Sequence, residues 1–276
     1  MKAVKFAAAL LATGLASSAL AQSADNWTGF YVGGHVGYAF QPNDDSERIV
    51  FDTDLDGRFG DTVRTGAGAD AFSPGFCGGA ANTTVPAGGC RGDRDGIEFG
   101  AQFGYDYQAP GSMLVVGFVA DYSRSRLRDS VSSFSTTPAN YTMTRRLRDV
   151  ITVRGRIGVA TGRALVYATG GLAYGGIRNS FATTNTANSF TGNGNEHGWG
   201  GAAGGGVEYR FSGPFSVGLE YLYRAVDAND YTVRAGPGTA PLTNPFRIVN
   251  ANGTDFQRNG DRLSSHGVTL NLNYRF

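Results

Sequence analysis

The last twelve residues of the chain alternate strictly between two kinds of side chain, and this pattern constrains the fold more than any other stretch. One parity is apolar and aromatic apart from its first member: His266, Val268, Leu270, Leu272, Tyr274 and Phe276. A period of two is the mark of a pleated strand, in which successive side chains point to opposite faces. Because the chain stops on the aromatic itself, we expect this strand to pair with another edge. In a closed barrel its partner is the first strand.

Seven further segments, bounded by turn residues, predict seven more strands, and six of these segments carry the same alternation. The seven segments span residues 30–40, 97–107, 114–122, 151–159, 164–175, 199–211 and 215–224. In six of them one parity is clearly apolar. Segment 164–175 is small or apolar on both parities, so its lipid-facing side stays open.

The connections between these segments alternate in length. Short turns at 109–112, 161–163 and 212–214 interleave with long polar segments at 41–95, 125–146, 178–197 and 225–263. Outer-membrane barrels have short periplasmic turns and long extracellular loops. The mean hydropathy of −0.21 is compatible with this, because lipid-facing and interior residues average out along each strand. The sequence therefore predicts an all-β fold, an eight-stranded antiparallel transmembrane β-barrel with short periplasmic turns and long extracellular loops.

Aromatic residues gather at the two ends of the predicted strands, as the girdles of a membrane barrel do. The turn ends carry Phe30, Tyr105, Tyr107, Tyr209, Phe211, Phe215, Tyr274 and Phe276, and the loop ends carry Tyr38, Phe40, Phe99, Tyr122, Tyr174, Trp199, Tyr221 and Tyr223.

The two ends of the chain carry a family resemblance. The closing Tyr274-Arg275-Phe276 resembles the last strand of bacterial outer-membrane barrels, and the stretch Trp27-Thr28-Gly29-Phe30-Tyr31-Val32-Gly33-Gly34 is similar to the opacity-protein-like porin family of small Gram-negative outer-membrane β-barrels. The resemblance implies a place in the outer membrane, with lipid and lipopolysaccharide as surroundings. It also implies that Tyr274 and Phe276 form an assembly signal read by the outer-membrane insertion machinery.

Residues 1–21 read as a signal peptide. Lys2 and Lys5 make a basic start, residues 6–15 are apolar, and Ala19-Leu20-Ala21 offers a cleavage site. The apolar run is shorter than the ~20 residues that a spanning helix needs. We therefore expect one exported domain, the outer-membrane β-barrel at 22–276.

The inward parity of the predicted strands holds charges of both signs in equal number: Glu98, Asp106, Asp121, Glu208 and Glu220 against Arg154, Arg156, Arg210, Arg224 and Arg275. The interior of an eight-stranded barrel is just wide enough for side chains to fill. We expect a network of salt bridges that plugs the lumen, in preference to a conducting pore. No catalytic acid–base pair stands out among ten mixed charges.

Cys77 and Cys90 are the only cysteines of an exported chain, and both fall in the first long segment. Because the periplasm is oxidising, we expect them to form a disulfide.

Asp52, Asp54 and Asp56, followed by Gly57, match the first half of a calcium-binding loop. Val63 stands where the closing glutamate is expected, although Asp61 could serve as a ligand instead. A loop calcium and a simple solvated acidic loop both stay open, and no other cofactor is expected.

The sequence favours a structural role over a catalytic one. It contains no Gly-x-Ser-x-Gly motif, and a net charge of +1 argues against nucleic acid as a partner. The long segments, such as 181–195 with its Ser, Thr, Asn and Gly, are expected to be solvated surfaces that contact an unknown extracellular ligand. We expect a non-enzymatic surface protein that serves envelope integrity and loop-mediated interaction; the alternative is a narrow, weakly selective porin.

Overall fold

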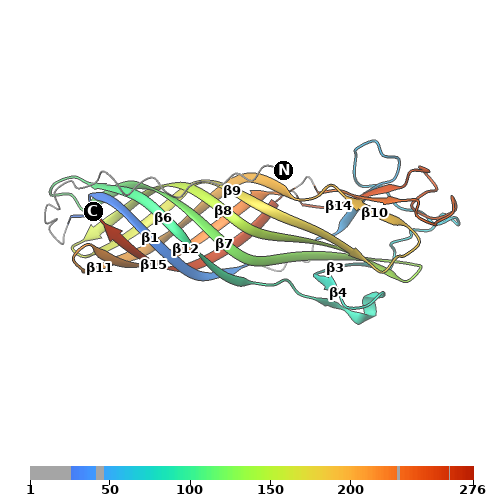
Figure 1. Cartoon of the computed structure of the whole chain (residues 1–276), viewed down its shortest axis with the longest axis horizontal. Coiled ribbons are helices and arrows are strands. Elements are labelled where there is room, and N and C mark those ends of the chain that lie inside the picture. The colour runs from blue at the N-terminus through green and yellow to red at the C-terminus, as the bar shows by residue number, and fades with distance from the viewer. Residues whose placement is uncertain (1–25, 42–46, 229–230, 261) are drawn as a thin grey trace, which may run out of the picture.

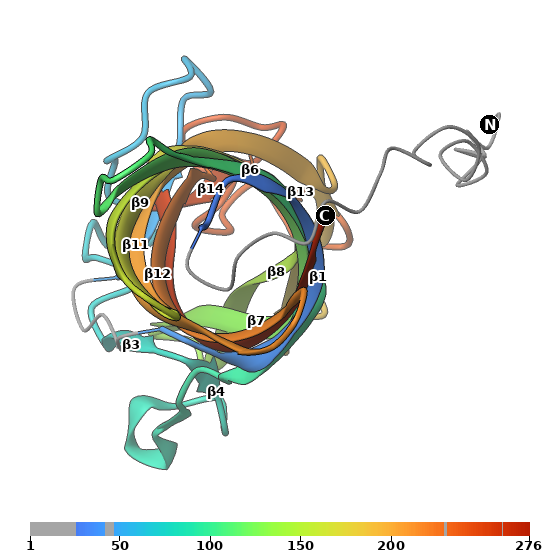
Figure 2. The same cartoon turned by 90° about the vertical axis from the view of Figure 1, so that its left-hand side faces the viewer.

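The computed structural model describes residues 26–41, 47–228, 231–260 and 262–276. The expected signal peptide at 1–21 lies outside the described residues. Eight long strands form one closed antiparallel ring, seen down its axis in Figure 2: β1 (Gly29–Phe40), β6 (Gly96–Gln108), β7 (Leu114–Ser135), β8 (Ala139–Thr161), β9 (Ala164–Thr183), β11 (Glu196–Ser212), β12 (Phe215–Asp227) and β15 (Arg262–Arg275). The predicted eight-stranded barrel is confirmed.

The last strand closes the ring on the first, as the C-terminal alternation predicts. β15 pairs antiparallel with β1, so that Tyr274 faces Val32 and Val268 faces Tyr38. At the opposite end from the long segments, β8–β9 and β11–β12 are joined by tight turns. Gly162 and Gly213 occupy the left-handed backbone region there, with φ of 60° and 49°, which only glycine adopts without strain.

The outer surface of the ring is apolar. Val166 and Leu172 are 59% and 62% exposed, which settles the lipid-facing side of β9 and leaves Leu165 and Tyr167 inside. Both predicted aromatic belts lie on this outer surface; Phe30, Phe215, Trp199 and others in them are exposed to the surroundings. An apolar surface that encircles the molecule is stable only in contact with lipid.

No helix in the part of the chain that the structure describes is long and apolar enough to cross a membrane. The single helical element among these residues is a 3₁₀ turn, η1 (Pro86–Gly88).

The long segments differ from the expectation of solvated loops. β7 and β8 continue past the aromatic belt and pair as far as Ser135 and Ala139, so most of 125–146 is a hairpin with its turn at 136–138. β9 likewise continues to Thr183 (Figure 1). A strand needs only about 9–11 residues to cross a bilayer, so the wall of the barrel stands well outside the membrane. The apolar pattern did not indicate these extensions because their outer face is polar.

The other long segments add short strands to this extension: β2 (Ile49–Asp52), β3 (Gly75–Gly78), β4 (Ala80–Ala81), β5 (Cys90–Arg91), β10 (Ser189–Gly192), β13 (Val233–Gly236) and β14 (Thr254–Arg258). β10, β13, β14 and β2 form a four-stranded sheet, and β3 pairs with β7. We call this extracellular assembly the cap; it comprises residues 47–94, 128–146, 178–195 and 231–260.

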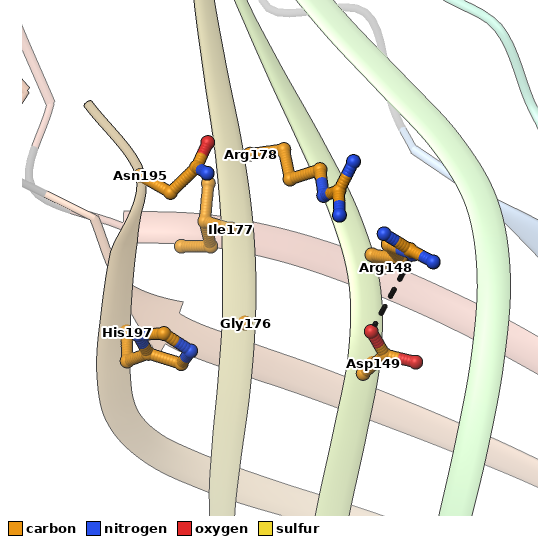
Figure 3. Close-up of a pocket in the computed structure, with 7 residues that line it drawn as sticks. All are labelled: Arg148, Asp149, Gly176, Ile177, Arg178, Asn195 and His197. Carbon is orange, nitrogen blue, oxygen red and sulfur yellow. Dashed lines mark ion pairs between the residues drawn. The ribbon is translucent and has the colours of Figure 1, made fainter. Parts of the chain in front are cut away.

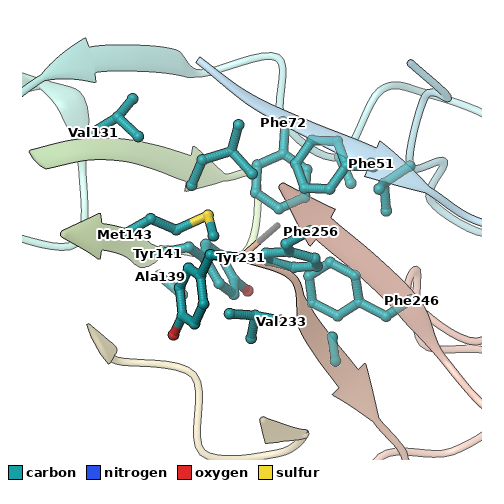
Figure 4. Packing of buried hydrophobic residues seen from close by; sticks show 14 residues of the cluster. Phe51, Phe72, Val131, Ala139, Tyr141, Met143, Tyr231, Val233, Phe246 and Phe256 are labelled. Carbon is teal, nitrogen blue, oxygen red and sulfur yellow. The ribbon is translucent and has the colours of Figure 1, made fainter. Parts of the chain in front are cut away.

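The cap has a hydrophobic core of its own, shown in Figure 4. Phe256 is fully buried at its centre, and its ring lies 5.0 Å from that of Phe51, 5.2 Å from that of Phe246 and 5.7 Å from that of Tyr141. Phe181 and Phe190, from the stretch expected to be a solvated surface, pack against this core. The expectation for 181–195 was therefore wrong in part, because these two aromatics anchor the segment.

Candidate functional site: a filled barrel beneath a folded cap

All ten charged residues that the alternation places inside the barrel are buried in the structure, with exposed fractions of 6% or less. They form salt bridges in three groups along the barrel axis, or lie against aromatic rings.

The group nearest the periplasmic turns combines two carboxylates with two guanidinium groups. Arg275 lies 2.9 Å from Asp106 and 3.7 Å from Glu208, and Arg156 lies 2.5 Å from Glu208 and 3.6 Å from Asp106. The Arg156 guanidinium also donates to the Tyr31 hydroxyl at 3.1 Å. Each carboxylate thus contacts both cations.

The middle group is centred on Arg154. Its guanidinium donates to Asp121 at 2.9 Å and to Glu220 at 3.1 Å, and its Nε donates to the Thr152 hydroxyl at 2.9 Å. The Tyr167 hydroxyl donates to the second oxygen of Glu220 at 2.8 Å. One arginine therefore neutralises parts of two carboxylates.

The third group is a pair of residues from distant strands. Arg224 donates through both terminal nitrogens to the two oxygens of Glu98, a bidentate arrangement that fixes geometry as well as charge. Arg210, the tenth charge, lies over the Trp27 ring, 4.6 Å from its centroid.

Two apolar layers bound this network along the axis. On the periplasmic side Trp27, Val115, Ala160, Leu165 and Tyr167 form one buried cluster. On the extracellular side the cluster contains Leu127, Leu147, Val150, Ile177, Leu222, Val226 and Leu263, with four alanines. The barrel interior therefore holds a network of charged residues between two apolar layers.

A second buried ion cluster lies above the upper apolar layer, and the sequence did not reveal it. Asp129 is fully buried and contacts Arg145 at 3.0 Å and Arg258 at 2.6 Å, and Glu47 contacts the same two arginines at 3.3 Å and 2.5 Å. The four residues come from three segments that the sequence predicts to be long polar loops. The one signal that could have found them is the cross-strand position of Asp129 opposite Arg145 in the β7–β8 extension.

This cluster shifts the pKa values of its acids in opposite directions. Burial raises the pKa of Glu47 to about 7, although Arg258 and Arg145 lower it. Burial and the negative charge of Asp129 raise the pKa of Asp93 to about 6. For Asp129, burial is outweighed by Arg258 and Arg145, which hold its pKa below the usual range.

Cys77 and Cys90 form a disulfide that closes a loop of the cap around β4 and η1. This agrees with the sequence prediction. The loop is anchored at one side, because β3, which holds Cys77, pairs with the extension of β7.

The candidate calcium ligands are only partly brought together. Carboxylate oxygens of Asp52, Asp54 and Asp61 lie within 4.8 Å of one another, whereas Asp56 lies outside this group and pairs with Arg58 at 3.3 Å. Asp52 already accepts backbone N–H groups from Leu55 and Gly57. Calcium binding at this loop stays a prediction.

The terminal aromatics lie on the lipid-facing side at the periplasmic end. Phe276 is 60% exposed, and its backbone N–H donates to the Phe30 carbonyl at 2.9 Å. Its ring contacts only that of Tyr274, 5.1 Å away between centroids, among the ring contacts of the described residues. Their role as an assembly signal stays a prediction.

Comparison with known proteins identifies the family to which this barrel belongs. Residues 7–276 match the family described as outer membrane protein beta-barrel domain, which covers nearly the whole chain. The chain belongs to this family. The resemblance indicated by the two chain ends and the outer-membrane location that it implies are confirmed.

Relatives of this chain include two outer-membrane immunogenic proteins. The chain is 27% identical over 261 residues to the 31 kDa outer-membrane immunogenic proteins of Brucella melitensis and Brucella suis, a match that covers 91% of this chain and 84% of theirs.

Two solved structures are more distant. OprG from Pseudomonas aeruginosa is 12% identical with a TM-score of 0.44, covering 91% of this chain and 98% of that protein. Ail of Yersinia pestis, solved in complex with the heparin analogue sucrose octasulfate, is 10% identical with a TM-score of 0.31, covering 90% and 99%.

Proposed function

We propose that this protein is a closed outer-membrane barrel that supports the envelope and presents the cap to an extracellular ligand. The observation that carries the proposal is the packing of the interior. Two buried apolar clusters lie on either side of a network of paired charges inside the barrel, and this arrangement supports a closed lumen. The feature that remains for contact with other molecules is the cap, which the hydrophobic core around Phe256 holds in a fixed shape.

We also propose that the protein has no catalytic role. Each interior carboxylate is engaged by at least one guanidinium group, as Glu98 is by Arg224 and Asp121 is by Arg154. A carboxylate held in this way is fixed in place by its guanidinium partner, and it lies behind an apolar layer. Neither property suits a general acid or base that must meet a substrate.

A narrow porin is the alternative, and the polar band between the two apolar layers favours it. Residues such as Asn271, Asn273 and Ser216 line the interior beside the charges. If side chains of the apolar layers moved aside, this band would conduct.

Conductance of the purified protein in planar bilayers decides between a closed barrel and a narrow porin. The closed-barrel proposal predicts no stable open state in the wild type. It also predicts that Leu222→Ser combined with Val150→Ser, which makes the upper apolar layer polar, increases leak current. Arg262→Gln, which changes an exposed charge of the cap side, is the control and leaves the current unchanged. Stable wild-type openings whose ion selectivity changes in Glu220→Gln would establish the porin instead.

A further inference from the structure

Arginines gather on the outer wall of the barrel where β7, β8 and β9 leave the aromatic belt. Arg128 lies opposite Arg146 between β7 and β8, and Arg146 lies opposite Arg178 between β8 and β9. An isolated bridge adds Arg94 beside Arg128. Four arginines thus occupy one cross-strand row. Like charges directly opposite one another destabilise a sheet, so this row has a cost unless an anion compensates it.

Among the described residues, few negative charges lie near enough to compensate the positive charge of this row. Below the row, Asp149 is shared between Arg124 at 3.8 Å and Arg148 at 3.6 Å. Among the residues that the structure describes, none forms a salt bridge with Arg94, Arg128, Arg146 or Arg178. Burial, together with the positive charges of Arg146 and Arg94, lowers the pKa of Arg128. The wall therefore carries a surplus of positive charge.

A pocket opens in this wall, with a volume of about 220 Å³ (Figure 3). Arg178 and Arg148 line one side of it, and His197 and Asn195 line the other. Its floor includes Gly176, where the missing side chain leaves space; a Cβ added there would come no closer than 3.6 Å to His197. Two guanidinium groups, an imidazole and an amide line this small cavity, and such groups are donors that bind phosphate. The Asp149 carboxylate lines it as well and pairs with Arg148 at 3.6 Å, so the surplus positive charge at the pocket comes from Arg178.

The height of the pocket relative to the membrane follows from the strand register. Tyr122, Ile151, Tyr174 and Trp199 form one cross-strand row of the outer aromatic belt. The row containing Asp149, Gly176 and His197 lies two residues further out, which is roughly 7 Å along a strand. Aromatic belts mark the headgroup level of a membrane. The pocket therefore lies where the headgroups of outer-leaflet lipids are.

The opposite side of the barrel lacks this feature. There the outward charges nearest the belt on β12 and β15 are Asp227 and Arg262, which pair with each other at 3.3 Å. The surplus on the face formed by β7, β8 and β9 is thus not matched on the face formed by β12 and β15.

We propose that this pocket and the arginine row bind the phosphorylated headgroup of an outer-leaflet glycolipid. The acyl chains of the lipid would lie on the apolar wall below, along Tyr174, Ile151 and Leu172. Basic residues beside an apolar membrane surface attract anionic lipids. Here the pocket adds the guanidinium groups of Arg148 and Arg178, whose forked geometry suits the oxygens of a phosphate group. The inference concerns the membrane-proximal edge of the cap and the barrel wall beneath it, and it does not depend on the extracellular ligand proposed for the cap.

The test uses the full-length mature protein in nanodiscs of phosphatidylcholine that contain a small fraction of bisphosphorylated lipid A. Lipid A retained after extraction into mild detergent is measured by native mass spectrometry. The wild type is expected to retain lipid A, and Arg146→Gln combined with Arg178→Gln to lower retention about tenfold or more. Gly176→Phe, which fills the pocket and keeps every charge, is expected to lower it as well. The matched control Arg262→Gln removes a charge from the other face and retains lipid A as the wild type does.

Each remaining outcome overturns the proposal. Equal retention by wild type and the double variant would show that the arginine row does not hold the lipid. Equal loss of lipid A in Arg262→Gln would show that retention depends only on the net charge of the protein. Full retention by Gly176→Phe would show that the pocket does not bind the lipid. Displacement of lipid A by millimolar inorganic phosphate, or unchanged retention of lipid A stripped of its phosphates, would also contradict a lipid headgroup site. Heat-dependent gel migration of every variant shows that the barrel is folded.

Discussion

The membrane part of the barrel and the cap are built from the same strands, yet they bury their side chains in different ways. In the membrane each strand shows one face to lipid and one to the interior, so β1 and β15 alternate between exposed and buried residues along their length. In the cap, β7 is buried on both faces from Asp129 to Phe134. Its partners there come from segments far away in the chain, such as β3 and the core around Phe256. Alternation reports a strand with two different surroundings, and it fails where both faces are covered.

The largest effect that separates the two parts is expected from Phe256→Ala. Phe256 contacts five other aromatic rings of the cap core within 6.2 Å between centroids. Removing a buried phenylalanine costs about 3–5 kcal/mol. We expect protease cleavage to appear throughout residues 231–260 and 47–72 on intact cells, while the barrel keeps its heat-dependent gel migration. Leu242→Ala, which changes an exposed apolar residue of the cap, is the control. Loss of the barrel migration in Phe256→Ala would show that cap and barrel are one cooperative unit.

A smaller effect is expected when Cys77 and Cys90 are both replaced by serine. Closing a loop of this length restricts the unfolded chain by roughly 3 kcal/mol in the chain-entropy model. The cap core around Phe51 and Phe72 does not depend on this loop. We therefore expect new cleavage sites within residues 77–92 and none in 49–72. Cleavage that spreads to Phe51 would mean that the disulfide, and not the aromatic core, orders the first segment.

The smallest effect expected is a pH dependence confined to the cap. The folded-state pKa of Glu47 is about 7, above its ordinary value of 4.5, so the folded cap binds more protons than the unfolded one between these values. Unfolding free energy then falls as pH rises through this window, and the contribution of Glu47 is lost above the folded pKa. Asp93, with its pKa of about 6, acts in the same direction.

We therefore expect slower protease cleavage of the cap at about pH 5 than at about pH 8, with the protease activity corrected for pH. Glu47→Gln should flatten this difference, whereas Asp227→Asn, which removes an exposed carboxylate, should leave it intact. A cap that becomes more protease-resistant as pH rises would contradict the assignment.

Much of the membrane part could be predicted from the sequence because each strand carries its own signal. The inward charges from Glu98 to Arg275 could be placed by parity alone, since an interior position is decided within one strand. Which charge meets which depends on register and strand order. The pairing of Arg224 with Glu98, from β12 and β6, is therefore visible only in the fold.

The cap could not be predicted in the same way. Its ion cluster joins Glu47, Asp129 and Arg258, which are separated by more than eighty residues at each step, and no local pattern links them. Its core uses scattered aromatics, such as Phe72 and Phe246, each of which is the single aromatic residue within three positions on either side. A single aromatic residue in such a segment cannot be recognised as buried from the sequence, because its burial depends on tertiary contacts with other aromatics far away in the chain.

Amide hydrogen exchange of the wild-type protein in outer-membrane vesicles tests most directly whether the extracellular half is a folded cap. The backbone pairing of β2, β13 and β14 and the burial of Phe256 predict slow exchange at 49–52, 233–236 and 254–258, approaching that of the barrel strands. Exchange of these segments at the rate of unprotected loops, beside a protected barrel, would contradict the account.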